Sequence, residues 1–294
     1  MKIRDEELDY KHHLAFDKNL GLLTGDPIQD AYWYRQAERM HSLHVSDAVR
    51  DVLQDAVIFA QKADNPEADF HLRFGVASRA YFIWVALRKL LDLIPPDREE
   101  PLPLDFVHEA AMDLNVIYIN IRGTLDNFAW CLLYLFGTKD TQRLPPAAVD
   151  LFGKNFLKDP NFAEVATYLK KFEAWNKELR GRRDPAAHRI PLSVPRAVLD
   201  NTAQEEYARV STEHDEAYNA AFDPLGGAAN RTEHLERTDL LNRELERIGR
   251  FEPVFVHHPD EGCMKIYPTV PQDIGQLVRI TRGLSDIILG KLKT

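Results

Sequence analysis

The stretch Asp105–Phe136, DFVHEAAMDLNVIYINIRGTLDNFAWCLLYLF, decides the fold class of this chain. Its apolar residues recur at alternating steps of four and three, which is the spacing of a heptad seam. They are Val107, Ala111, Leu114, Tyr118, Ile121, Leu125, Phe128, Leu132 and Leu135. The pattern predicts one long helix, packed along much of its length and stopped by Gly137.

Shorter helical patterns precede this segment. Asp26-Pro27 combines a capping residue with a proline at the first helical position and predicts a helix to about His44. Ser46-Asp47 has the composition of the next cap, so we expect a second helix to begin there. A longer apolar pattern then runs from Pro66 to the Pro95-Pro96 pair, which ends it.

Helical patterns also dominate the chain after the long segment. The expected elements are helices over about 161–179, 196–222 and 232–249, a β-hairpin over 254–267 and a final helix from Pro271. The two middle helices are rich in Glu and Arg, so we expect them on the outside of the molecule.

The sequence therefore predicts an all-α fold. We expect a multi-helix bundle around a long central helix, with one small β-hairpin near the C-terminus. Residues 1–100 would form an N-terminal helical region packed on the core, and residues 101–294 a second helical region, or the two would form one continuous domain.

Composition excludes several functional classes. The chain has 294 residues, a formal net charge of −9 and 45% hydrophobic residues, so it can bury a large core but presents no general polyanion-binding surface. The two cysteines, Cys131 and Cys263, form no metal-type pair, and we expect no metal or cofactor. With no apolar signal core and no apolar run long enough for a span, we expect a cytoplasmic protein without a membrane partner.

A basic stretch stands out against this acidic background. Between Lys177 and Arg189 the chain carries five Lys or Arg residues and two carboxylates. Gly181 has the composition of a helix stop, and Asp184-Pro185 that of a new helix start. On this interpretation His188 lies in the first turn of a new helix with Arg183 just ahead of its cap. The positive end of that helix can hold a phosphate.

A polar strip on the long helix is the second candidate. Asn115, Arg122 and Asp126 fall together on the flank of the apolar seam at helical spacing. Two interpretations stay open for it. Arg122 and Asp126 are either a partly exposed ion pair of ordinary type or the polar wall of an active site.

These stretches carry a resemblance to a known family. Arg183-Asp184-Pro185-Ala186-Ala187-His188 resembles the Arg, polar residue, then His motif of the HEPN superfamily, all-α domains known mostly as metal-independent ribonucleases. The segment Asn120–Asn127 is similar to an Arg-x-x-Leu-Asp stretch of bacterial HEPN-like proteins. The likeness covers the central third of the chain, from about Asp105 to Pro195. Pro191 departs from the family pattern, in which the motif continues into a longer helix.

The resemblance implies a function and roles for residues. It implies a homodimer that cleaves RNA to a 2′,3′-cyclic phosphate. The catalytic residues of this homodimer would be Arg183 and His188, one copy of each from either chain. Asp184 would cap and orient, Asn115, Arg122 and Asp126 would support the site, and Arg180, Arg182 and Arg189 would hold phosphates. A toxin or defence role with an antitoxin partner would fit such an enzyme. The alternatives are a binding-only HEPN-like protein, an interaction scaffold for a phosphate-bearing ligand, and an unrelated structural turn.

Spacing alone does not distinguish the motif. Arg39 to His44 and Arg209 to His214 have the same separation, but neither lies at a Gly and Asp-Pro junction. Glu38, His41 and His44 could form half of a carboxylate-bridged metal site, yet no second Glu-x-x-His partner follows, so we interpret them as surface residues.

Overall fold

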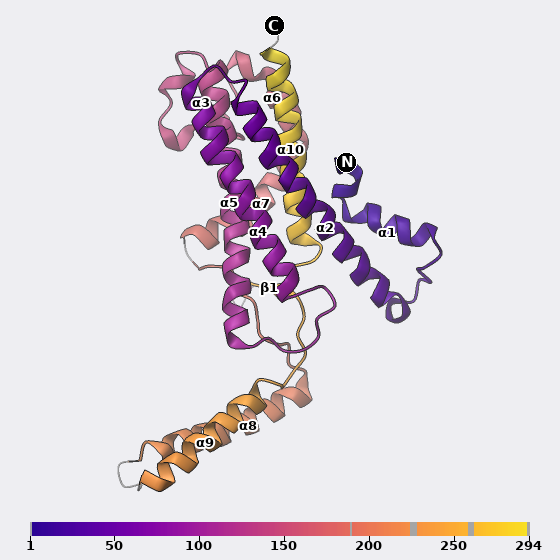
Figure 1. Ribbon diagram of the computed structural model, residues 1–294, viewed down its shortest axis with the longest axis vertical. Helices are drawn as coiled ribbons and strands as arrows, with labels where there is room; N and C mark the ends of the chain where they lie inside the picture. Colours follow the sequence, from indigo (N-terminus) through magenta and orange to yellow (C-terminus); the bar gives the residue numbers. More distant parts are fainter. Residues whose placement is uncertain (1, 189, 224–227, 258–261, 293–294) are drawn as a thin grey trace.

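The computed structural model describes residues 2–188, 190–223, 228–257 and 262–292, and most of these lie in helices (Figure 1). The α-helices are α1 (Tyr10–Asn19), α2 (Pro27–Ala60), α3 (Pro66–Phe70), α4 (Ser78–Leu93), α5 (Leu104–Phe136), α6 (Ala163–Leu169), α7 (Glu173–His188), α8 (Asn201–Ala221), α9 (Ala228–Leu245) and α10 (Thr269–Lys291). A π-helical segment, His71–Ala77, joins α3 to α4, and short 3-10 turns include Pro146–Ala148 and Lys170–Phe172. The prediction of an all-α fold is confirmed.

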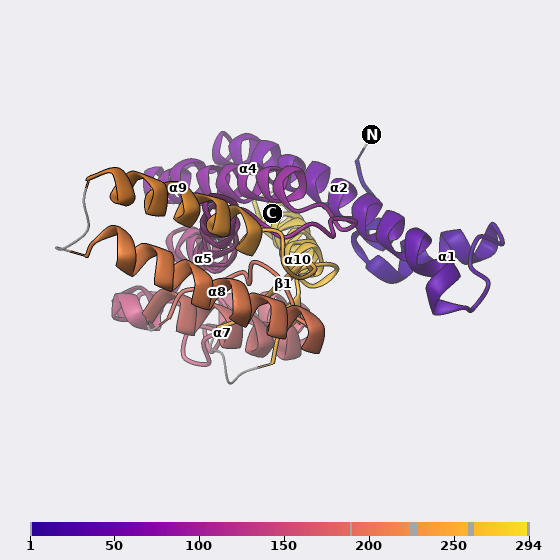
Figure 2. The same ribbon diagram turned by 90° about the horizontal axis from the view of Figure 1, so that it is seen from below.

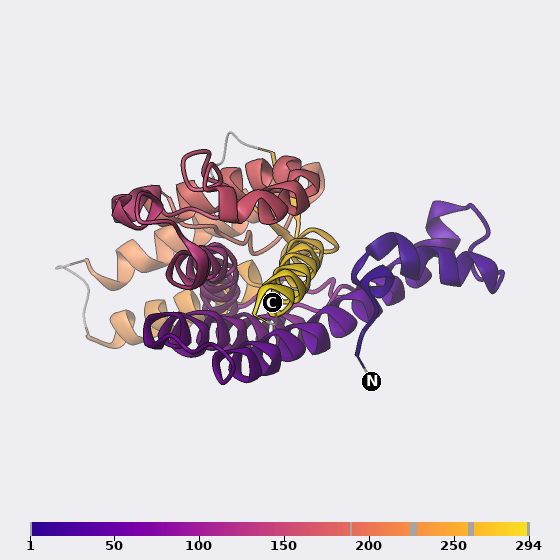
Figure 3. The ribbon, with the colours of Figure 1, turned by 90° about the horizontal axis from the view of Figure 1, so that it is seen from above.

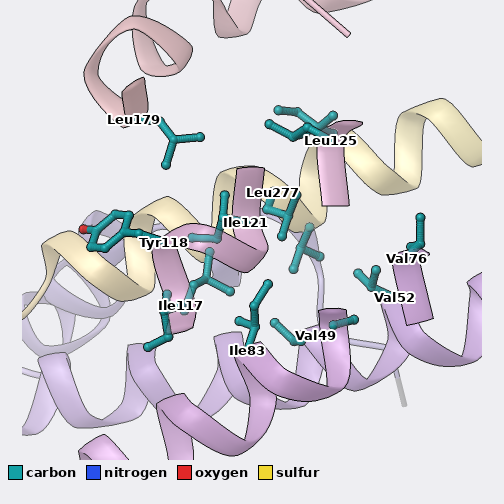
Figure 4. Close-up of a cluster of buried hydrophobic side chains, with 14 of the residues drawn as sticks. Val49, Val52, Val76, Ile83, Ile117, Tyr118, Ile121, Leu125, Leu179 and Leu277 are labelled. Atoms are coloured by element: carbon teal, nitrogen blue, oxygen red, sulfur yellow. The ribbon is translucent and has the colours of Figure 1, made fainter. Parts of the chain in front are cut away.

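The long helix α5 is the centre of the bundle, as its heptad pattern predicts. Leu114, Tyr118, Ile121 and Leu125 are fully buried. Tyr118, Ile121 and Leu125 lie in one buried cluster with Val49, Ile83 and Leu277 from the helices around them (Figure 4). Helices α4, α7 and α10 and the π-helical segment all contact α5. Figure 3 shows the bundle end-on, with α2 and α4 on one side of α5, α6 and α7 on the other, and α10 beside α5 between these two groups.

One continuous core joins the N-terminal and C-terminal parts of the bundle. Its buried side chains run from Leu8, ahead of α1, to Ile288 in α10. Helix α1, which the sequence patterns do not predict, packs on the first half of α2, and this pair extends away from the bundle (Figure 1). No helix among the described residues combines the length and apolarity needed to cross a membrane.

The predicted break after His44 is wrong, because α2 runs without interruption from Pro27 to Ala60. Its start is as predicted, since the Asp26 carboxylate accepts a hydrogen bond from the N–H of Ile28. Ser46, the expected cap, instead lies buried inside the helix. Neither Gly nor Pro interrupts the chain there, so packing of that face on the core outweighs the weak preference of Ser for a cap.

The predicted helix junction at Gly181 is also wrong, because α7 continues to His188. Gly181 does not adopt the left-handed conformation of a helix stop. Leu179 is buried in the core and Arg182 is bound to α10, so the chain on both sides of Gly181 is held in the helix. Asp184 therefore caps no helix, and the basic stretch forms the C-terminal end of α7. The phosphate site predicted from a positive helix end is lost with it.

The β-hairpin near the C-terminus is confirmed. β1 (Val254–Phe255) pairs antiparallel with β2 (Met264–Lys265). Helices α8 and α9 form an antiparallel pair that projects from the bundle, outside the main core as expected (Figures 1 and 2). The pair has a small apolar core of its own, made by Val210, Ala217, Leu241, Leu245 and Ile248.

Candidate functional site

A cleft of about 490 Å³ lies where α5, the 146–150 segment and α7 meet. Its lining combines three arginines, three aspartates and one indole. These residues are Arg122, Asp126, Trp130, Asp150, Arg180, Arg183 and Asp184, with Pro146, Ala147 and Val149 completing the wall. The fold thus brings five of the residues singled out in the sequence into one place.

Arg122 is the buried centre of this cleft. Its side chain is only 9% exposed, and its guanidinium pairs with the Asp126 carboxylate at 3.1 Å and with the Asp150 carboxylate at 2.5 Å. It also donates to the Asn176 Oδ1 atom of α7 at 3.3 Å. The interpretation of Arg122 and Asp126 as a partly exposed ion pair is confirmed, and the pair forms one wall of an open cleft.

Asp150 is a site residue that the sequence reasoning missed. It follows the 3-10 turn Pro146–Ala148 and bridges Arg122 of α5 to Arg180 of α7. Although burial opposes its charge, the two guanidiniums and the N–H of Phe152 hold the pKa of the Asp150 carboxyl below its ordinary value. A single aspartate in an irregular segment has no periodic pattern, so only the tertiary structure reveals it.

Arg183 lies on the rim of the cleft and interacts with two aspartates. Its guanidinium pairs with the carboxylate of Asp184 at 3.1 Å. Burial raises the pKa of the Asp126 carboxyl, against the nearby positive charges of Arg122 and Arg183. Arg183 is therefore close to the Arg122–Asp126 wall. The resemblance implies that this pair supports the arginine of the motif.

Two of the predicted site residues lie elsewhere. Arg182 points to the opposite side of α7, where it pairs with Asp273 of α10 at 2.8 Å, so the structure does not place it among phosphate-binding groups. Asn115 binds the main chain of Leu192 through both its amide atoms, at 3.0 and 3.1 Å, and anchors the segment after α7. Arg189 and the side chain of His188 lie outside the described part of the structure.

The Asp273 centre is structural. Its carboxylate, 4% exposed, accepts hydrogen bonds from Tyr118 Oη at 3.0 Å, Trp175 Nε1 at 2.9 Å and Arg182 Nη2 at 2.8 Å. Although burial opposes the charge of Arg182, Asp273 holds the pKa of that guanidinium above its ordinary value. This centre fastens α5, α7 and α10 together with every acceptor partnered.

The charges of the cleft determine what it can bind. Three guanidiniums face three carboxylates, so the lining is close to neutral and has no excess of cations. The Arg183–Asp184 pair is the most exposed, with half of the Asp184 side chain in solvent. Among the three guanidiniums, that of Arg180 is the most exposed, at 44% against 25% for Arg183, so an anion that enters the cleft would reach Arg180 most easily and Arg183 next.

Comparison with known proteins adds no relative. No protein-family model matches the chain, and neither a curated protein nor a solved structure matches it. Among the described residues, no group of three His, Cys, Asp or Glu side chains is arranged to hold a metal ion.

Proposed function

We propose that this protein is an HEPN-like, metal-independent endoribonuclease that acts as a homodimer. The observation that supports the proposal is the meeting of Arg183 with the Arg122–Asp126 pair in one open cleft. These residues belong to the two stretches that resemble the family, and 61 positions separate them along the chain. His188 lies one helical turn beyond Asp184 in α7, which keeps it near the same end of the helix.

The proposed chemistry is transfer of the phosphoryl group within the RNA chain. One histidine accepts the proton of the 2′-hydroxyl, whose oxygen attacks the adjacent phosphorus, while the bond from phosphorus to the 5′-oxygen breaks. The second histidine protonates that leaving oxygen. The products are a 2′,3′-cyclic phosphate and a 5′-hydroxyl. Since each chain supplies one His188, two chains complete the site, and Arg183 stabilises the charge that grows on the phosphate oxygens.

The supporting groups have separate parts in this proposal. Arg180 and Arg183 contact phosphates, whereas the buried Arg122, held by Asp126 and Asp150, positions the wall against which Arg183 lies. Arg189, next to His188, adds a further cation to bind the RNA strand.

The test is cleavage of a mixed RNA pool in the presence of chelator. We expect His188→Ala to lower the rate by about 10²-fold or more, the usual contribution of a general acid or base. The matched control is His214→Ala, because His214 follows Arg209 at the same spacing on the projecting helix α8. Products should carry cyclic phosphate ends. Equal cleavage by wild type and His188→Ala would overturn the proposal.

A second candidate is a helical interaction scaffold that binds a phosphate-bearing ligand and catalyses no reaction. The near neutrality of the cleft favours binding without catalysis, because Arg122 and Arg180 already share Asp150 as a partner and so offer less charge to stabilise a transition state. This candidate predicts that RNA binds, that Arg183→Ala weakens binding, and that no cyclic phosphate forms at any protein concentration. An antitoxin partner would belong to the enzyme and not to this alternative.

A further inference from the structure

A second pocket, of about 310 Å³, lies on another side of the molecule, between the first half of α2 and the β-hairpin. Its polar lining comes from elements far apart in the chain. Tyr34, Arg35 and Glu38 belong to α2, Arg98 follows α4, Arg250 precedes β1, and Lys265 lies in β2. Glu38 and the β-hairpin line this pocket, whereas neither of them lines the cleft described above.

Cations outnumber carboxylates in this pocket. Glu99, outside the lining, pairs with Arg35 at 2.6 Å and with Arg250 at 2.9 Å, so one carboxylate holds two guanidiniums in position. Arg98 is bound by main-chain carbonyls of Leu93 and Glu100, which fix its orientation without neutralising its charge. Lys265 makes no ion pair with any residue in the described part of the chain.

Glu38 is the unusual acid among these cations. Burial raises the pKa of its carboxyl to about 7, although Lys265 and Arg35 favour the ionised form. Near neutral pH the carboxyl is therefore protonated in about half of the molecules. A protonated carboxyl can donate an O–H to an anion, whereas a carboxylate would repel it.

We propose that this pocket binds a small oxyanion, with Lys265 and Arg98 supplying the positive charge and the Glu38 carboxyl group lining the same pocket from α2. The volume is at the lower end of the range for small-molecule sites, which suits a compact ligand bearing a phosphate, sulfate or carboxylate group. The site is independent of the proposed ribonuclease activity, so either can fail without the other.

Binding should depend on pH through Glu38. The groups around it are Tyr34 and Arg35 on α2, Arg98 after α4, Arg250 and Glu252 before β1, and Lys265 on β2. Tyr10 and Tyr267 also interact with its charge, but burial raises the pKa of both phenols, so they stay neutral. Sulfate keeps its double charge across neutral pH, so a change in its affinity reports on the protein. From pH 6 to pH 8 we expect the affinity to fall about tenfold, because the protonated fraction of Glu38 falls by about that factor.

The experiment is a calorimetric titration of the full chain with sodium sulfate at constant ionic strength, carried out at pH 6, 7 and 8. Lys265→Met should weaken binding at least about fivefold at each pH, since it removes one charge at the ligand. Glu38→Gln keeps a hydrogen-bond donor and should bind with the affinity of wild type at pH 6 and with no change up to pH 8. Lys158→Met removes an exposed lysine that lines neither this pocket nor the cleft, so it is the matched control and should bind sulfate like wild type.

Three outcomes would overturn the inference. They are sulfate affinity unchanged by Lys265→Met, a pH dependence that persists in Glu38→Gln, and loss of binding in Lys158→Met. Circular dichroism melts of each variant show whether the chain is folded. Because Lys265 is exposed, its replacement should leave the melting temperature unchanged.

Discussion

Arg182 and Arg183 are neighbours in the sequence but belong to two different polar centres on different sides of α7. Arg182 meets Asp273 in the interior, where the carboxylate has three donors and almost no exposure to solvent. Arg183 meets Asp184 at the rim of an open cleft. At about 100° per residue, adjacent helix positions readily diverge in this way. The difference shows that one basic stretch can contribute both to the interior of the bundle and to the lining of an open cleft.

The largest effect is expected from breaking the interior centre. Asp273→Ala leaves the Arg182 guanidinium buried without its partner, and such losses cost about 3–5 kcal/mol of unfolding free energy. Urea unfolding measures the difference. Asp140→Ala is the matched control, because that aspartate is 96% exposed and pairs with Arg143 on the surface. A loss below about 1 kcal/mol for Asp273→Ala would show that the interior centre does not hold the bundle together.

The second prediction is that Arg182 and Arg183 affect different measured quantities, the unfolding free energy and the rate of RNA cleavage. Arg183→Ala should lower RNA cleavage by about 10²-fold while leaving the unfolding free energy within about 1 kcal/mol of wild type. Arg182→Ala should do the reverse, with stability reduced by about 2–4 kcal/mol and the rate per folded molecule within about threefold. If both variants lose activity and stability together, the division between the two sides of α7 is wrong.

A smaller and pH-dependent effect is expected at Asp150. Asp150→Asn weakens the bridge between Arg122 and Arg180 and should cost about 1–3 kcal/mol at pH 7. The folded pKa of Asp150 lies below its ordinary value of 3.8, so its stabilisation is present above that value and is lost as the pH falls through the folded pKa. The gap between wild type and Asp150→Asn should therefore stay constant down to about pH 5 and narrow progressively as the pH falls below 3.8. A gap that stays constant in denaturant melts below pH 3.8 would contradict the assignment.

The smallest effect is expected at the rim. Asp184→Ala removes a half-exposed partner of Arg183 and should change the unfolding free energy by no more than about 0.5 kcal/mol. The same change removes a negative charge beside Arg183, so RNA should bind somewhat more tightly in a filter-binding assay. Weaker RNA binding in Asp184→Ala would instead show that this carboxylate orients the arginine.

The helical core could be predicted from the sequence because its signals are periodic. The seam from Val107 to Leu135 specifies α5, and Asp26 with Pro27 specifies the start of α2. Signals that depend on one residue failed, since Ser46 and Gly181 both lie inside helices that tertiary packing continues.

The candidate site could be predicted only in part. Arg122 and Asp126 are neighbours by helical spacing, and their pairing follows from the sequence. The meeting of this pair with Arg183, and the bridge made by Asp150, depend on how α7 and the 146–150 segment pack on α5. The opposite direction of Arg182 follows from a partner in α10, 91 positions away, which no local pattern indicates.

The projecting pair α8 and α9 has a consequence for how the protein unfolds. The segments that flank the pair meet each other, because Val198 and Arg250 form an isolated antiparallel β-bridge. The small core of the pair is separate from that of the bundle. Melting of this arm would leave the buried surface of α5 untouched, so it should open as an independent cooperative unit. Amide protons of α8 and α9 should exchange with solvent long before those of α5, and excision of the arm should yield a shortened chain that still folds.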